Sequence, residues 1–161
     1  MRGAVVLAVV LAALCTTPVA ADEVKYHSDC QVIDTTRLEK FGRDGQAAQL
    51  SHFTCQITGG PLDGFVVTGT NIWDMDDGGT GALLGSIAVA QKAGSTVMYE
   101  VRDVTRSLKF TNGRVVGWEA TSWGLYEAAS GTAKPLVGKT FSSVARFTSP
   151  KTFTIENTIN D

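Results

Sequence analysis

The chain has 161 residues, which is enough for one domain with a sizeable core, and we expect no second domain. Its 14 lysines and arginines against 16 aspartates and glutamates give a formal charge of −2 at pH 7, and the basic residues form no run. The electrostatic surface that binds nucleic acids or anionic membranes is therefore missing, and we expect neither partner.

The first 21 residues have the pattern of a secretory signal peptide. A basic residue near the start is followed by an apolar run over Val5–Leu14 and by a Val19-Ala20-Ala21 cleavage site. The apolar run is too short to span a bilayer. We therefore predict that residues 1–21 are removed, that residues 22–161 are secreted or periplasmic, and that the mature chain has no membrane span.

Two of the three cysteines, Cys30 and Cys55, remain in the mature chain and are predicted to form a disulfide in an oxidising compartment. The midpoint between them falls in the turn signal Gly42-Arg43-Asp44-Gly45. A strand on each side of that turn would bring the two cysteines nearly opposite each other, so the disulfide and the turn support one another.

Residues 64–90 form the clearest pattern, because two apolar runs enclose the Asp/Gly cluster at 76–79, which is typical of a hairpin turn. Both faces of this hairpin are apolar, so we expect a core to cover one face and a helix, a terminus or another subunit of a homo-oligomer to cover the other. Centring the turn between Asp77 and Gly78 predicts the opposite pairs Trp73–Ala82, Gly69–Ser86, Phe65–Ala90 and, on the other face, Ile72–Leu83 and Thr68–Ile87.

Farther along, Val97, Tyr99 and Val101 alternate with Met98, Glu100 and Arg102. Leu108 and Phe110 have the opposite parity, which predicts a bulge between the two sets. Asn112-Gly113 is the strongest hairpin signal in the chain. It sets Phe110 near Val115 and Leu108 near Gly117, and it predicts three inward side chains in the following strand, namely Val116, Trp118 and Ala120.

The whole pattern predicts an all-β chain with eight candidate strands and no sustained helical period. Residues 31–40 also fit a short helix, because Thr36 to Glu39 has the form of a capping box, but the expected disulfide favours a strand. Residues 22–29 are expected to be a polar lead-in. Eight is a number at which an antiparallel meander closes, so we predict one up-and-down barrel domain over residues 22–161, with a β-sandwich as the alternative.

The segment Gly124-Leu125-Tyr126-Glu127-Ala128-Ala129-Ser130-Gly131 resembles the Gly-x-Tyr/Phe-x-x-Ala-x-Gly segment of allene-oxide-cyclase-like and dirigent-like barrels, and Gly79 to Gly85 has a similar Gly-rich pattern. The resemblance covers short pieces of the second half of the chain. It implies an eight-stranded barrel that is often trimeric. No position matches the catalytic residues of those families, so the resemblance implies no catalytic role for any residue here.

Aromatic side chains with a polar tip are the candidates for a ligand pocket, although core packing is the ordinary role of such residues. We select Trp73 and Trp118 first, together with Tyr99. His52 is expected on the strand face opposite the core, and it would line a cavity only if the barrel interior were the polar side.

We find no catalytic motif: no GxSxG elbow, HExxH helix, phosphate loop or dinucleotide fingerprint occurs. His27, Ser28 and Asp29 are neighbours on one segment, so their side chains diverge and cannot form a triad. The carboxylates of Asp74–Gly79 suit Ca²⁺ but lack the later glutamate of a calcium loop, so a plain turn is preferred and no metal or cofactor is predicted.

Together these patterns predict a module that binds a small apolar ligand or a protein partner without catalysis. A cofactor-free cyclase or isomerase resembling allene oxide cyclase is the alternative. In that case a dry pocket would fold a reactive substrate with little acid or base help.

Overall fold

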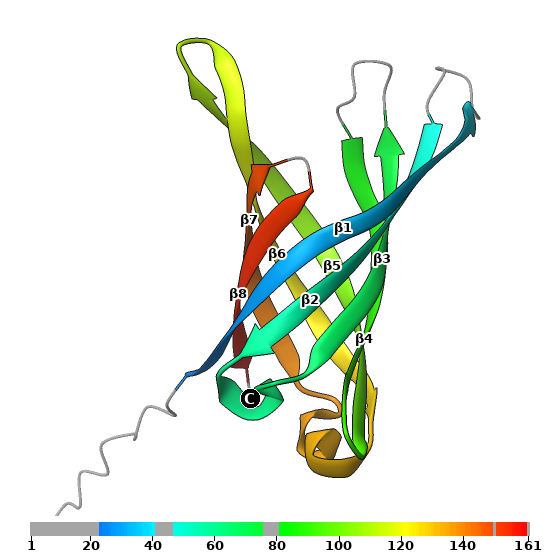
Figure 1. The fold of residues 1–161 in the computed structure, drawn as a ribbon, viewed down its shortest axis with the longest axis vertical. Helices are drawn as coiled ribbons and strands as arrows, with labels where there is room; N and C mark the ends of the chain where they lie inside the picture. The colour runs from blue at the N-terminus through cyan, green and yellow to red at the C-terminus, as the bar shows by residue number, and fades with distance from the viewer. Residues whose placement is uncertain (1–22, 41–46, 76–80, 150, 161) are drawn as a thin grey trace, which may run out of the picture.

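A computed structural model describes residues 23–40, 47–75, 81–149 and 151–160, and these residues form one closed antiparallel β-barrel (Figure 1). Each strand pairs with the next, and the last strand pairs with the first, so the sheet closes on itself. The predicted up-and-down barrel is confirmed over the sandwich. The strands are β1 (Val24–Lys40), β2 (Ala47–Thr58), β3 (Val66–Met75), β4 (Gly81–Lys92), β5 (Ser95–Thr111), β6 (Arg114–Ala129), β7 (Thr140–Ser149) and β8 (Thr152–Asn160).

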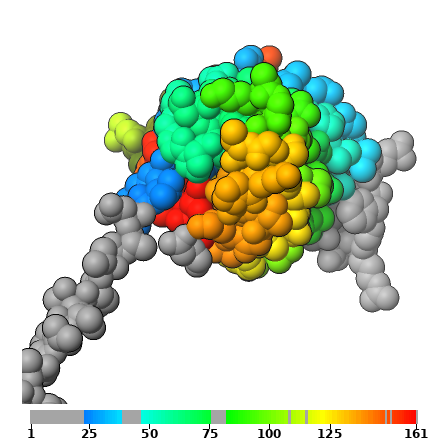
Figure 2. Space-filling view, turned by 90° about the horizontal axis from the view of Figure 1, so that it is seen from below, coloured from blue at the N-terminus to red at the C-terminus, as the bar shows by residue number. Residues whose placement is uncertain are grey.

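Two short 3-10 helices, η1 (Gly60–Leu62) and η2 (Gly131–Leu136), cover one end of the barrel, which we call the closed end. Their apolar side chains Leu62 and Leu136 are buried against the core. Figure 2 views the molecule from this side, where atoms of both helices lie across the end of the barrel. The pairing of Val24 with Ile159 places the start of β1 beside the finish of β8 at the closed end.

Tyrosine and phenylalanine rings fill the barrel next to the closed end. The hydroxyls of Tyr26 and Tyr126 are hydrogen-bonded at 2.8 Å across the interior. The rings of Tyr99 and Phe141 pack around Tyr126, with centroid distances of 5.9 and 5.0 Å to it. Burial raises the pKa of Tyr26 well above its usual range and that of Tyr126 to about 12, so both phenols are neutral at physiological pH.

The predicted disulfide is confirmed. Cys30 of β1 and Cys55 of β2 are direct cross-strand partners, their Cα atoms lie 4.0 Å apart, and both cysteines are buried. The turn that was expected to join the two strands lies outside the described residues. The choice of strand over helix for residues 31–40 is correct, because β1 is extended throughout.

The polar lead-in expected at residues 22–29 is wrong from Val24 onward, where β1 begins. Tyr26, Ser28 and Cys30 alternate inward and are buried. The strand was missed because the barrel accepts a serine and a tyrosine on its inner face, so hydrophobic alternation does not mark this part of β1.

The central hairpin forms as β3 and β4, but its register differs from the prediction. Gly69 pairs with Ala88 and Thr68 with Val89, a shift of two residues that leaves every side chain on its expected face. A bulge after Ile72 reduces the shift to one residue, so Trp73 faces Leu83 and not Ala82. The Asp/Gly turn itself lies outside the described residues.

The outer face of β3 and β4 is apolar and exposed, as the hairpin pattern indicated. Leu84 is 61% and Ile87 54% exposed, and Val66 and Ile72 are also exposed. Ile33, which lies at a bulge in β1, is exposed on the same side of the barrel. Among the described residues no element covers this face, and the homo-oligomer expected from it stays a prediction.

β5 and β6 form a long hairpin that extends beyond the rim of the other strands (Figure 1). The predicted bulge is confirmed between Arg102 and Thr105, and Phe110 pairs with Val115 as expected. A second bulge shifts the next pair, so Leu108 lies opposite Trp118 and not Gly117. Ala120 is buried inside the barrel as predicted, whereas Val116 is exposed on the extended part.

Candidate ligand site at the open end of the barrel

The end opposite η1 and η2 contains a cavity of about 190 Å³ inside the barrel rim, which we call the mouth cavity. Side chains from seven of the eight strands line it, because each strand directs alternate residues inward. The described lining residues are Val32, Thr35, Gln49, Ser51, Phe53, Asn71, Trp73, Met75, Arg106, Trp118, Phe147, Ser149 and Phe153.

Five aromatic rings form a continuous row at the base of this cavity. Trp73 meets Trp118 edge to face at 6.1 Å, and Trp118 stacks on Phe147 with 3.3 Å between ring centroids. Phe147 stacks on Phe153 at 4.6 Å, and Phe153 meets Phe53 edge to face at 5.8 Å. The row gives the cavity a rigid apolar floor, the surface on which flat or aliphatic ligands pack.

Arg106 is the only charged residue among the described lining of the mouth cavity. Its Cζ atom lies 4.6 Å from the centroid of the Trp118 ring, a cation–π contact. Its Nε atom is buried and has no hydrogen-bond partner. Burial lowers the pKa of Arg106, but the group stays cationic at neutral pH because the ordinary pKa of an arginine lies far above neutrality.

Below the aromatic row a second, inner cavity of about 80 Å³ shares Asn71, Trp73 and Trp118 with the mouth cavity. Its walls are mixed, with Tyr99, Val101 and the small polar side chains Ser28, Ser86, Ser122, Ser143 and Asn157. Ser122 and Ser143 are hydrogen-bonded to each other at 2.6 Å. This volume suits a few water molecules or the tip of a ligand.

The structure brings three of the four predicted ligand residues together. Trp73 and Trp118 line both cavities, and Tyr99 lines the inner one. His52 lies outside the barrel, where its ring is hydrogen-bonded to the hydroxyl of Thr70 at 2.8 Å. The interior is therefore on the face of β2 that carries Phe53 and Cys55, and His52 does not line either internal cavity.

Arg106, Phe147 and Phe153 were not identified from the sequence. After the predicted bulge, the even-numbered residues Leu108 and Phe110 share one face of the strand. Arg106 is also even-numbered, so the bulge could have identified it as a residue of that face. Phe147 and Phe153 alternate in β7 and β8 like ordinary core residues, and the cross-strand pairing of Trp118 with Phe147 and of Phe147 with Phe153 brings them into the row.

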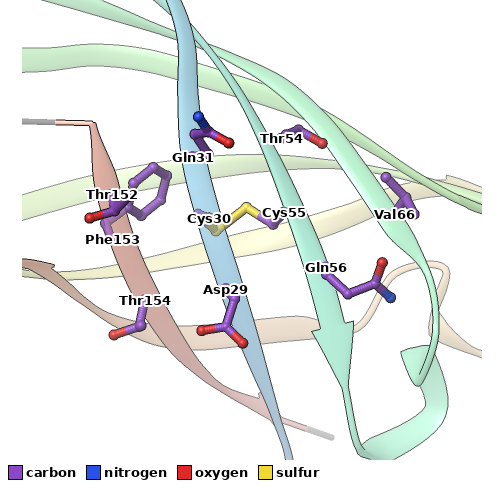
Figure 3. A pocket seen from close by; sticks show the side chains of 10 residues that line it. All are labelled: Asp29, Cys30, Gln31, Thr54, Cys55, Gln56, Val66, Thr152, Phe153 and Thr154. Atoms are coloured by element: carbon purple, nitrogen blue, oxygen red, sulfur yellow. A yellow bond between two sulfur atoms is a disulfide. The ribbon is translucent and has the colours of Figure 1, made fainter.

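A larger hollow of about 580 Å³ lies on the outer surface of β8, β1, β2 and β3 (Figure 3). Its lining includes the exposed polar side chains Asp29, Gln31 and Gln56, and the disulfide bridges β1 and β2 there. We prefer the smaller mouth cavity as the ligand site despite its size, because its side chains converge on an enclosed space with an apolar floor.

Near this hollow the ring of His27 lies between two carboxylates, Glu156 at 2.6 Å and Asp29 at 3.1 Å. The hydrogen bond to Glu156, and then that to Asp29, raises the pKa of His27. Ser28 is buried on the inner face, so the three neighbours do not form a triad, as expected from their adjacency.

No group of three or more potential metal ligands occurs among the described residues, a set that leaves out the turn at 76–80. Nor is any helix in the described ranges long and apolar enough to cross a membrane. No family model matches the chain, and neither a curated protein nor a solved structure matches it.

Proposed function

We propose that this chain is a secreted or periplasmic binding protein that takes a small ligand with an apolar body into the mouth cavity and does not catalyse a reaction. The observation that carries the proposal is the row of five aromatic rings below a cavity that lies at one end of the barrel, while η1 and η2 cover the other end. The disulfide supports the oxidising compartment.

The volume of the cavity limits the ligand. At about 190 Å³ the mouth cavity is smaller than the 300–1,000 Å³ that is common for drug-sized ligands, so we expect a ligand with one or two rings or a short chain. The inner cavity is too small to add more than a few atoms.

Binding is favoured over the cyclase alternative because of the ionisable groups that line the two cavities. Within the described residues these are Arg106 and Tyr99, and neither a carboxylate nor an imidazole lines the cavities. Burial raises the pKa of Tyr99, so it stays a neutral phenol, and Arg106 stays protonated. A general base for isomerisation is therefore missing from these walls.

Native mass spectrometry of the protein purified from its own host tests the proposal. We expect a mass that corresponds to cleavage after Ala21 together with a bound small molecule that is released on denaturation. The Ser51→Phe variant places a ring in the mouth cavity and should lose that ligand. The matched Thr68→Phe variant places the same ring on the outer face and should keep it.

The proposal fails if the host-purified wild type carries no ligand, or if the molecule that it carries binds Ser51→Phe equally well. Conversion of a bound molecule by the purified wild-type protein would favour the cyclase alternative.

A further inference from the structure

Arg106 is a cation inside the barrel, and the described residues give it no counter-charge. Arg102 and Arg146, on the outer face, are paired with carboxylates: Arg102 with Glu100 and Glu127, and Arg146 with Glu119. Arg106 has no hydrogen bond or ion pair with any described residue, and its Nε atom is buried. A buried donor without an acceptor costs free energy comparable to a lost hydrogen bond. A ligand that offers an acceptor to the Nε atom of Arg106 would remove this cost.

The bulge in β5 fixes the inward direction of Arg106. Val97, Tyr99 and Val101 point inward before the bulge, and Val104 and Arg106 line the cavities after it. Asp103, at the bulge, has a positive φ of 45°, and its carboxylate accepts a hydrogen bond of 2.6 Å from the indole of Trp123 on the outside. The hydrogen bond between Trp123 and Asp103 stabilises the bulge. The inward direction of Arg106 therefore follows from the backbone of β5.

The surroundings of Arg106 specify the chemistry of an occupant. Uncharged polar side chains, among them Gln49, Ser51 and Asn71, share the cavity with the aromatic row. One unpaired guanidinium can neutralise one negative charge, and its planar fork matches a carboxylate. A phosphate ester with two charges would need a second cation, and the described lining residues provide none.

We propose that the mouth cavity binds small organic carboxylates, with the carboxylate on Arg106 and the apolar body on the row formed by Trp73, Trp118 and Phe147. This inference rests on the proposed function and adds the charge of the ligand to it. Because the carboxylate lies beside the Trp118 ring, binding should change the tryptophan fluorescence.

Two matched probes, phenylacetate and phenylacetamide, test the proposal on the disulfide-intact chain, with tryptophan fluorescence as the readout. They have the same apolar body and differ in charge. We expect wild type to bind phenylacetate at least tenfold more tightly than phenylacetamide. Arg106→Gln should bring the ratio of the two affinities close to one, and Arg106→Lys should keep part of the preference.

Arg146→Gln is the matched control, because it removes an arginine from the outer face and should leave the preference unchanged. A second readout is the Nε–H resonance of Arg106 in the ¹H–¹⁵N spectrum, which should shift with phenylacetate and not with phenylacetamide.

The outcomes separate the two proposals. Equal affinity of wild type for both probes, or a preference that survives Arg106→Gln, would overturn the carboxylate inference and leave the apolar site standing. Failure of both probes to bind wild type would count against both the inference and the proposed function.

Discussion

Gly124 shows how a single residue permits the packing of the barrel interior. A Cβ atom at this position of β6 would lie 2.3 Å from the backbone oxygen of Glu100 and 2.3 Å from the ring of Phe141. The absence of a side chain therefore lets β5 and the Phe141 ring approach β6 closely.

We expect Gly124→Ala to lower the free energy of unfolding by about 1–3 kcal/mol, because the methyl group overpacks the core. Gly85→Ala is the control: its Cβ would meet no atom within 4 Å, and the stability should stay unchanged or rise slightly. Urea denaturation of both variants measures the difference. Equal stability of the two variants would mean that the close approach at Gly124 is absent.

His27 gives the fold a pH-dependent contribution. Its pKa is raised in the folded chain by Glu156 and Asp29, so the protonated ring stabilises the fold fully below the unfolded pKa of about 6.5. This contribution is lost as the pH rises through the raised folded value. In an NMR titration we expect a His27 pKa above 6.5 that falls in Glu156→Gln; a pKa that is the same in that variant would contradict the hydrogen bond as the main cause.

The sequence predicted single residues well where parity alone decides. Trp73, Tyr99 and Trp118 were selected as large aromatic residues with a polar tip, and their places on the strands put all three inside the barrel. The parity switch at the bulge in β5 placed Arg106 on the inward face too, but we did not select it, since a charged residue in a strand normally faces water. Ser28 and Asn157 were missed for the same reason, because a barrel with internal cavities buries small polar side chains that a packed core excludes.

At the scale of elements, the turn residues in the sequence predicted the order of the strands but not the register in which neighbouring strands pair. Asn112-Gly113 adopts positive φ at both residues, as an Asn-Gly hairpin turn requires, and it joins β5 to β6 as predicted. Bulges after Ile72 and Lys109 then shift the pairing by one residue. Such bulges respond to the closure of the whole barrel, so a local pattern does not reveal their positions.

The disulfide is the covalent link between β1 and β2, and its removal should destabilise the barrel. Replacing Cys30 and Cys55 together by alanine should lower the free energy of unfolding by about 3 kcal/mol, mainly because the unfolded chain gains freedom. Denaturation of wild type with and without reductant should give a similar difference. The double variant is the control, since reductant should leave it unchanged; a loss under 1 kcal/mol would contradict the expectation.

At the scale of the whole molecule, the barrel has a packed end and an end with cavities. The Tyr26–Tyr126 hydrogen bond connects β1 to β6 across the packed end. We expect Tyr126→Phe to lower the free energy of unfolding by about 1–3 kcal/mol, because it leaves the buried Tyr26 hydroxyl without its partner. The double variant with Tyr26→Phe should be more stable than Tyr126→Phe alone. Thermal unfolding measures both, and additive losses would contradict this coupling.

The expected homo-oligomer concerns the exposed apolar face of β3 and β4. If a second copy covers this face, sedimentation of the wild type should give a mass above that of the monomer, and Ile87→Lys should return it to the monomer. Thr121→Lys, on the outer face of β6, is the control and should keep the assembly. A wild type that is monomeric at all concentrations would contradict the expectation.

The neighbouring ends of β1 and β8 at the closed end determine how the protein can be handled. A tether or reporter domain fused after Asn160 would leave the molecule on the side away from the mouth cavity, so a sensor surface could hold the protein with that cavity facing the solution. The pairing of Val24 with Ile159 also means that a short peptide could connect the two strands. A circular permutant opened elsewhere would then keep all eight strands and every cavity side chain.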